Sequence, residues 1–126
     1  MGARPVVARN RRAKRDFDIH ETYEAGLSLT GSEVKSIRAG RVSLDEAYAR
    51  VEDGEIWLHG MHVAPYSPSS YHGHEPGRPR KLLLRQREID HLVGLTARAG
   101  FTLVPLSLHF NPRGYAKLEL AVAKGR

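Results

Sequence analysis

The sequence contains no cysteine among its 126 residues. This absence excludes a disulfide scaffold, a zinc or iron–sulfur site with cysteine ligands, and catalysis by a thiol. The sequence also lacks any apolar run near the roughly 18 residues that cross a bilayer, and its arginine-rich start lacks the apolar stretch of a signal peptide. We therefore predict a soluble, cytoplasmic protein with no membrane partner.

Positive charge is concentrated at the N-terminus. The chain carries 20 Lys and Arg against 14 Asp and Glu, a net charge of +6, and 40% of its residues are hydrophobic, enough for one globular domain. Residues 1–15 hold six basic side chains and no acid: Arg4, Arg9, Arg11, Arg12, Lys14 and Arg15. These features predict a flexible basic arm over 1–15, a neutral folded domain over 16–126, and a polyanionic partner such as nucleic acid.

One alternating stretch and two capping patterns predict the elements of the first third. Residues 17–23 alternate between apolar and polar positions, which is typical of a half-buried strand. Thr30 followed by Glu33 forms a capping box, so we predict a helix from there to Gly40. Residues 43–46 repeat this pattern and predict one further helical turn.

The middle of the chain combines a hairpin, a loop and a helix. Residues 48–59 contain two short apolar stretches on either side of an Asp53-Gly54 turn. This pattern predicts a β-hairpin. Residues 65–80 are rich in proline and glycine and predict a loop. Residues 86–99 carry apolar side chains at helical spacing and predict a second helix.

The last hairpin has the clearest pattern. Around a turn at 111–114, two sets of apolar residues recur with period two: Val104, Leu106, Leu108 and Phe110, then Ala116, Leu118, Leu120 and Val122. Each set is expected to share one face, so Tyr115, Lys117 and Glu119 face the other way. These short strands and few helices predict a mainly β, single-domain antiparallel β-barrel of the oligonucleotide/oligosaccharide-binding type.

The histidines do not form a recognisable catalytic motif. His59 with His62, and His72 with His74, are close in sequence, but no carboxylate stands at the spacing of a zinc hydrolase. The sequence also lacks a nucleophile motif and a glycine-rich phosphate loop. We predict no metal, no cofactor and no catalytic residue. A composite site that cleaves phosphodiesters with the loop histidines is the alternative.

Basic residues near aromatic or aliphatic ones favour RNA binding. The block at 78–81 leads into three leucines, and Lys117 projects beside Tyr115. Such groups can meet phosphates while their neighbours cover bases and sugars. An ordinary solvated surface is the competing interpretation, and core packing is preferred for Leu82 and Leu83.

Five strings in register carry a specific resemblance: Asn10-Arg11-Arg12-Ala13, Tyr23-Glu24-Ala25-Gly26-Leu27, the run from Gly31 to Arg38, the run from Arg78 to Leu84, and Ala123-Lys124-Gly125-Arg126. Together they resemble the SsrA-binding protein family, also called small protein B. The resemblance implies a closed antiparallel β-barrel related to the oligonucleotide-binding fold, with about six strands and three helices. It further implies a non-catalytic adaptor that binds the tRNA-like domain of transfer-messenger RNA. The adaptor then delivers this RNA to stalled 70S ribosomes for trans-translation, which tags the peptide and releases the ribosome.

We expect the chain to bind RNA as a monomer in a 1:1 complex. The resemblance also suggests which of its side chains contact the RNA. The positions that match the family's RNA-contacting motifs are Asn10, Arg11, Glu24, Lys35, Arg38, Arg80, Lys81, Leu84, Lys117 and Lys124. The family's basic C-terminal tail does not follow Arg126 in this sequence, so we expect RNA binding to be retained and the ribosomal step to be affected. A generic barrel protein for single-stranded RNA, or a ribosomal protein, is the alternative function.

Overall fold

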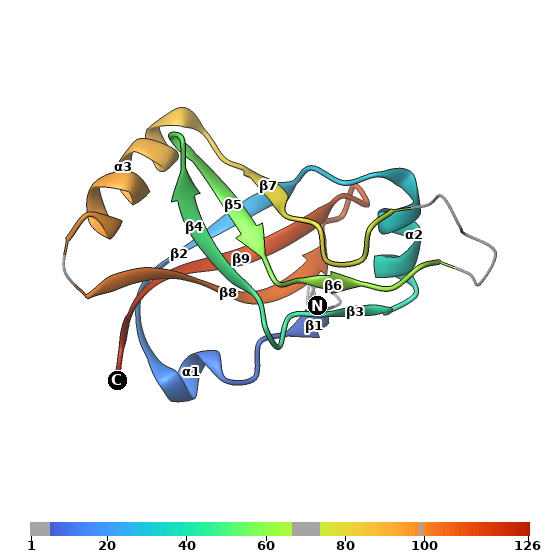
Figure 1. The fold of residues 1–126 in the computed structure, drawn as a ribbon, viewed down its shortest axis with the longest axis horizontal. Helices are drawn as coiled ribbons and strands as arrows, with labels where there is room; N and C mark the ends of the chain where they lie inside the picture. The colour runs from blue at the N-terminus through green and yellow to red at the C-terminus, as the bar shows by residue number, and fades with distance from the viewer. Residues whose placement is uncertain (1–5, 67–73, 99) are drawn as a thin grey trace.

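The structure, a computed structural model, describes residues 6–66, 74–98 and 100–126 (Figure 1). These residues form three helices: α1 (Ala13–Asp16), α2 (Gly31–Arg38) and α3 (Gln86–Thr96). They also form nine strands: β1 (Val6–Arg9), β2 (Phe17–Leu27), β3 (Val42–Ser43), β4 (Tyr48–Glu52), β5 (Glu55–His59), β6 (His62–Val63), β7 (Arg80–Leu83), β8 (Phe101–Phe110) and β9 (Ala116–Gly125). The prediction of a mainly β chain with three helices is confirmed.

Seven strands form one antiparallel sheet in the order β1-β8-β4-β5-β7-β2-β9, and β8 also pairs with β9. The pairings therefore lead from β8 through β4, β5, β7, β2 and β9 back to β8. Strands β3 and β6 form a separate two-stranded sheet. Helices α2 and α3 lie at opposite ends of the large sheet (Figure 1). No helix in the described ranges is long and apolar enough to span a membrane.

Most local predictions agree with the structure. Thr30 caps α2, because its hydroxyl accepts from the Glu33 N–H at 3.3 Å while the Glu33 carboxylate accepts from the Thr30 N–H at 2.8 Å. The β4–β5 hairpin turns through Asp53 and Gly54, which both have positive φ. The helical turn predicted over 43–46 is wrong: Ser43 ends β3, and a non-helical turn follows.

Four apolar side chains of β9 point into the main core as predicted: Ala116, Leu118, Leu120 and Val122. Strand β8 differs from its prediction. Val104 and Leu106 pack in a small second cluster with Ala13 of α1, whereas Leu108 and Phe110 pack in or against the main core. The register with β9 shifts between positions 105 and 107, and a bulge there inverts the alternation.

The N-terminal segment is more ordered than its charge suggested. Strand β1 pairs with β8, Asn10 N–H donates to Leu106 O at 2.8 Å, and Ala13 is 2% exposed. The flexible arm predicted over 1–15 is therefore wrong for residues 6–15, because short apolar side chains anchor this segment. Its basic side chains remain exposed: Arg9, Arg11, Arg12, Lys14 and Arg15. Residues 1–5 of that prediction, and 67–73 of the predicted loop, lie outside the described residues.

Candidate nucleic-acid interface

A polar surface, which we call the carboxylate face, lies on the outer side of β2, β8 and β9. Glu24 of β2 stands directly opposite Glu119 of β9, and Ser107 of β8 is the neighbour of Glu119 on the other side. With His109, these residues line a cavity of about 300 Å³. Directly opposed like charges repel each other unless donors satisfy them, and here Ser107 Oγ donates to Glu119 Oε1 at 3.5 Å.

His109 holds one of these carboxylates in place. The ring is only 8% exposed, and its Nε2 lies 3.1 Å from Glu24 Oε1, with Nε2–H as the donor. Glu24 itself stays accessible, with 44% of its side chain exposed. A carboxylate positioned by a buried neighbour can accept a hydrogen bond from a base or a ribose hydroxyl without losing its own orientation.

Lys117 lies beside the carboxylate face, between Gly26 of β2 and His109 of β8. Its neighbours Ala116 and Leu118 are buried while Lys117 is half-exposed, which confirms the predicted alternation. Within the described ranges, no hydrogen bond or ion pair occupies its ammonium group. The group is therefore available to a phosphate.

The N-terminal segment borders the other end of this face. Asn10 Nδ2 donates to Pro105 O at 2.9 Å, and Asn10 Oδ1 accepts from the Arg12 N–H at 3.3 Å. The Asn10 amide thus holds the segment on β8. Arg11 and Lys14 are exposed and line a cavity of about 220 Å³ together with Glu119. This arrangement places cations on both sides of the paired carboxylates.

A mostly apolar groove of about 380 Å³ adjoins Lys117 on the side of β7, and we call it the β7–β9 groove. Leu83 and Tyr115 line it and are 50% and 65% exposed. Gly26 lies between Leu83 and Lys117: an added Cβ would come within 3.3 Å of Leu83 Cβ and 3.6 Å of Lys117 Nζ. The groove therefore places an ammonium group next to two large exposed apolar side chains.

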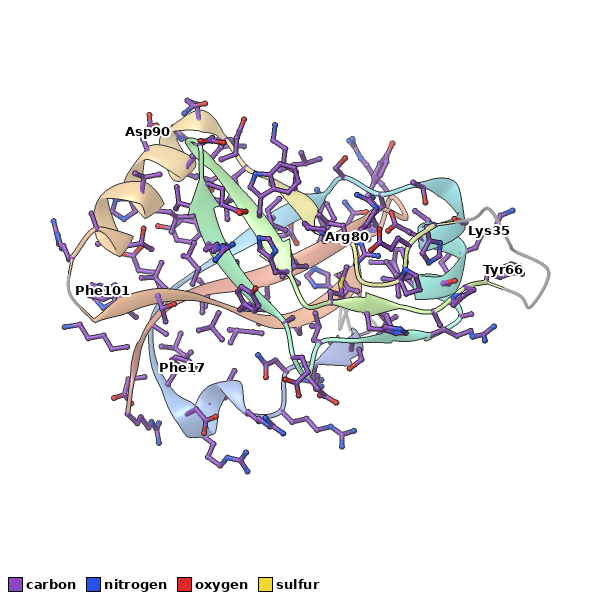
Figure 2. The ribbon with its side chains drawn as sticks, in the orientation of Figure 1. Phe17, Lys35, Tyr66, Arg80, Asp90 and Phe101 are labelled. Atoms are coloured by element: carbon purple, nitrogen blue, oxygen red, sulfur yellow. The ribbon has the colours of Figure 1, made fainter. Side chains whose placement is uncertain are left out.

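Arg38 and Lys35, both on α2, have protein partners. Arg38 Nη2 donates to Gly114 O at 2.7 Å, and its guanidinium lies 4.6 Å from the centroid of Phe110, so it fastens the β8–β9 turn to α2. The Lys35 ammonium lies 5.8 Å from the ring centroid of Tyr66, at the α2 end of the molecule (Figure 2). Both side chains remain exposed.

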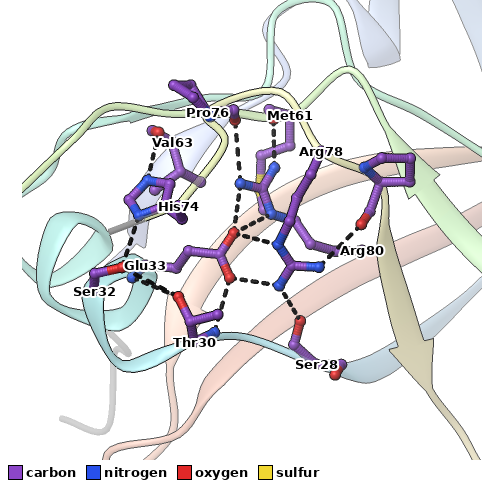
Figure 3. A network of polar contacts seen from close by, with 11 residues as sticks. Ser28, Thr30, Ser32, Glu33, Met61, Val63, His74, Pro76, Arg78 and Arg80 are labelled. Atoms are coloured by element: carbon purple, nitrogen blue, oxygen red, sulfur yellow. Dashed lines mark hydrogen bonds and ion pairs between the residues drawn. The ribbon is translucent and has the colours of Figure 1, made fainter. Parts of the chain in front are cut away.

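Arg80 is the predicted contact that the structure contradicts. It is 0% exposed, and its guanidinium donates to Glu33 Oε2 at 2.8 Å, to Met61 O at 2.7 Å and to Pro76 O at 3.1 Å (Figure 3). Its Nη2 also forms an ion pair with Glu33 Oε2 at 2.7 Å. A side chain without solvent access cannot reach a phosphate, and each of the three nitrogens already has a partner within the protein. Arg80 is a structural residue.

The partner of Arg80 is equally buried. Glu33 also accepts from Arg78, at 2.9 Å from Nε and 2.6 Å from Nη2. Burial alone would raise the pKa of Glu33, but hydrogen bonds from Arg78, from the Thr30 amide and from Arg80 outweigh it and lower the pKa to about 2. Glu33 is therefore ionised at neutral pH and links α2, β7 and the segment before β7.

The remaining predicted contacts are scattered. Lys81 Nζ lies 3.0 Å from Glu55 Oε2, and Leu84 is half-buried against the main core. The Lys124 ammonium lies 4.6 Å from the ring centroid of Phe101. These three residues do not line the carboxylate face or the β7–β9 groove.

The histidines singled out in the sequence make ordinary structural contacts. His59 Nε2 lies 2.9 Å from Glu52 Oε1, and this hydrogen bond lowers the pKa of Glu52. His74 bridges Ser32 Oγ, at 2.8 Å, and Val63 O, at 2.9 Å. His72 lies outside the described residues. Within the part of the chain that the structure describes, no group of three or more His, Cys, Asp or Glu side chains could hold a metal ion.

Comparison with known proteins identifies the family. The model of the SmpB protein family matches residues 7–126. The chain belongs to the SmpB family. It is 54% identical to the SsrA-binding protein of Moorella thermoacetica, over 96% of this chain and 78% of that protein. It is 53% identical to the SsrA-binding protein of Geobacillus thermodenitrificans, over 99% of this chain and 80% of that one.

A solved structure of the family shares the fold. A chain of the structure described as "tmRNA-SmpB: a journey to the center of the bacterial ribosome" superposes with a TM-score of 0.76 and is 51% identical, over 93% of this chain and 82% of that chain. The similarity covers the carboxylate face, the N-terminal segment and the β7–β9 groove, since the family model matches residues 7–126.

Sequence reasoning missed two residues that shape the candidate interface. Ser107 and His109 share the outer side of the sheet with Lys117 and Glu119, and the predicted alternation of β8 is consistent with that side for both. Pro105, which has no N–H to give to a neighbouring strand, was the available signal for a bulge. The bulge changes the side of Val104 and Leu106, whereas positions 107 and 109 lie opposite Leu108 and Phe110 with or without it, so for Ser107 and His109 the available signal was the alternation itself.

Proposed function

We propose that this chain binds the tRNA-like domain of transfer-messenger RNA and delivers it to stalled ribosomes for trans-translation. The observation that carries this proposal is the 51% identity, with a TM-score of 0.76, to a chain of the tmRNA–SmpB structure in the bacterial ribosome. Membership of the SmpB family and the SsrA-binding names of the relatives support the same conclusion. The net charge of +6 suits an RNA partner.

We further infer that the large sheet is a closed barrel related to the oligonucleotide-binding fold. This is supported by the strand pairings, which lead from β8 back to β8 through five other strands. In such a barrel, β2, β9 and β8 are adjacent strands. Their outer side presents the carboxylate face to a partner without disturbing the core.

We assign the RNA contacts to exposed side chains of this outer side. Lys117 and Arg11 neutralise phosphates, while Glu24, positioned by His109, accepts hydrogen bonds from base or ribose donors. Asn10 acts mainly by holding the N-terminal segment in place. Lys35, Arg38, Lys81 and Lys124 add positive charge near the surface, and Leu84 supports the core.

We propose that this chain is a cytoplasmic adaptor, that it acts as a monomer in a 1:1 complex with the RNA, and that it catalyses no reaction. Incubating RNA with the protein, with and without divalent metal ions, tests the last point. Intact RNA is the expected result, and cleavage that depends on the protein would contradict the adaptor role.

The binding test compares two RNAs of equal length, the tRNA-like domain of transfer-messenger RNA and an unstructured single strand. We expect salt-dependent binding to the first and little affinity for the second at the same salt concentration. Equal affinity for both would favour a generic single-stranded RNA-binding protein, and binding to neither would refute an RNA-binding function.

A further inference from the structure

We propose that the β7–β9 groove holds one unstacked nucleotide of the bound RNA, with its base against Tyr115 and Leu83 and its phosphate at Lys117. This inference rests on the proposed RNA-binding function and specifies the chemistry that one part of the interface recognises. The groove has about 380 Å³ of space and is more apolar than the carboxylate face next to it.

The apolar part of the groove suits the face of a base. Tyr115 is 65% exposed and Leu83 is 50% exposed, and few large hydrophobic side chains in the described ranges are as open to solvent. Neither follows from core packing, since neighbouring Ala116 and Leu82 already fill the interior at these positions. An aromatic ring and a branched aliphatic chain at one groove give a base two apolar surfaces to contact.

The positive charge in the groove favours a nucleotide over an uncharged apolar ligand. Lys117 Nζ lies close to Gly26, where an added Cβ would be 3.6 Å away from it, and both residues line the groove. Its ammonium has no ion-pair partner in the residues that the structure describes. A neutral apolar segment of a protein would leave this charge unmatched, whereas a nucleotide brings an apolar face and a phosphate within one unit.

The groove is continuous with the carboxylate face. Lys117 lies between Gly26 and His109 in neighbouring strands, and Glu24 is two residues before Gly26 along β2. Consecutive nucleotides of one RNA segment can therefore meet Glu24 and the groove together. The turn that carries Tyr115 is held by the hydrogen bond from Arg38 to Gly114 O, so the ring is presented from a fixed support.

The test titrates the tRNA-like domain of transfer-messenger RNA with the wild-type chain and three variants at one salt concentration. Tyr115→Ala removes the ring, and Tyr115→Phe keeps it without the hydroxyl. Tyr48→Ala removes another exposed tyrosine, 49% open to solvent on β4 and stacked on His59 away from the groove. Thermal melts of each variant show that the fold is retained, and chemical probing of the bound RNA locates any base that the protein protects.

We expect Tyr115→Ala to weaken binding about 10-fold, because a base stacked on an aromatic side chain is commonly worth this much. Tyr115→Phe and Tyr48→Ala should stay within about twofold of wild type. One base protected by the wild-type chain should become reactive with Tyr115→Ala only. Wild-type affinity and an unchanged protection pattern for Tyr115→Ala would overturn the nucleotide site, as would equal losses for Tyr115→Ala and Tyr115→Phe. Failure of the wild-type chain to bind would instead refute the proposed function.

Discussion

Glu33→Gln is the substitution that tests most sharply how the buried ionic network stabilises the fold. The carboxylate accepts hydrogen bonds from Arg78, Arg80 and the Thr30 N–H, all at 2.6–2.9 Å. Glutamine keeps the shape of the side chain but removes its charge. Arg80, which is 0% exposed, would then remain buried without its counter-ion.

Two estimates of the stability lost in Glu33→Gln agree. The pKa of Glu33 falls from 4.5 to about 2 in the folded chain, which corresponds to roughly 3 kcal/mol at about 1.4 kcal/mol per tenfold change in proton affinity. Removing one partner of a buried ion pair costs about 3–5 kcal/mol in other proteins. We therefore expect Glu33→Gln to lower the free energy of unfolding by about 3 kcal/mol, and the melting temperature by roughly 10 °C.

Urea denaturation at pH 7 measures this loss directly, with Arg80→Met and the double variant Glu33→Gln/Arg80→Met completing the cycle. The double variant should lose less than the sum of the single ones, because it no longer buries an uncompensated guanidinium. A change below about 0.5 kcal/mol for Glu33→Gln, or strictly additive losses, would refute the role assigned to the network.

The same network predicts a pH dependence. A carboxylate whose pKa is depressed on folding stabilises the folded state fully above its unfolded pKa, near 4.5, and loses this contribution as the pH falls towards 2. The difference in stability between wild type and Glu33→Gln should therefore shrink across this range. A constant difference between pH 5 and pH 2.5 would contradict the ionised state of Glu33.

Two further substitutions test the assignment of the interface. Lys117→Ala should weaken binding to the tRNA-like domain and reduce the slope of the log–log salt plot by about 1, since one phosphate contact is lost; an unchanged slope with unchanged affinity would show that Lys117 meets no phosphate. Glu24→Gln should weaken binding by about 1–3 kcal/mol although it removes a negative charge, because the carboxylate accepts charge-assisted hydrogen bonds. Tighter binding with an unchanged melting temperature would show that Glu24 only repels the RNA and accepts no hydrogen bond from it.

Local patterns predicted the elements whose determinants lie within a few residues. The capping box at Thr30, the Asp53-Gly54 turn and the period-two alternation of β9 each depend on neighbours in the chain, and each is confirmed. The inverted face of β8 depends on a bulge at one position, and only Pro105 indicated it.

Long-range contacts explain the predictions that failed. Arg80 has the composition of an RNA contact, but its burial arises from meeting Glu33, which lies 47 residues away in sequence. Residues 6–15 look like a charged arm, although Val7, Ala8 and Ala13 anchor them on segments almost 100 residues later. A charge count describes only the side chains of such a segment. It does not indicate which strand the backbone of the segment pairs with.

The most direct test of the central claim is ultraviolet crosslinking in bacteria that produce this chain with an affinity tag, followed by sequencing of the crosslinked RNA. The account predicts that transfer-messenger RNA is enriched above every other RNA and that its crosslinks map to the tRNA-like domain. It also predicts that Lys117→Ala reduces this enrichment while an equal amount of folded protein is recovered. Crosslinks spread over messenger or ribosomal RNA, with no enrichment of transfer-messenger RNA, would contradict it.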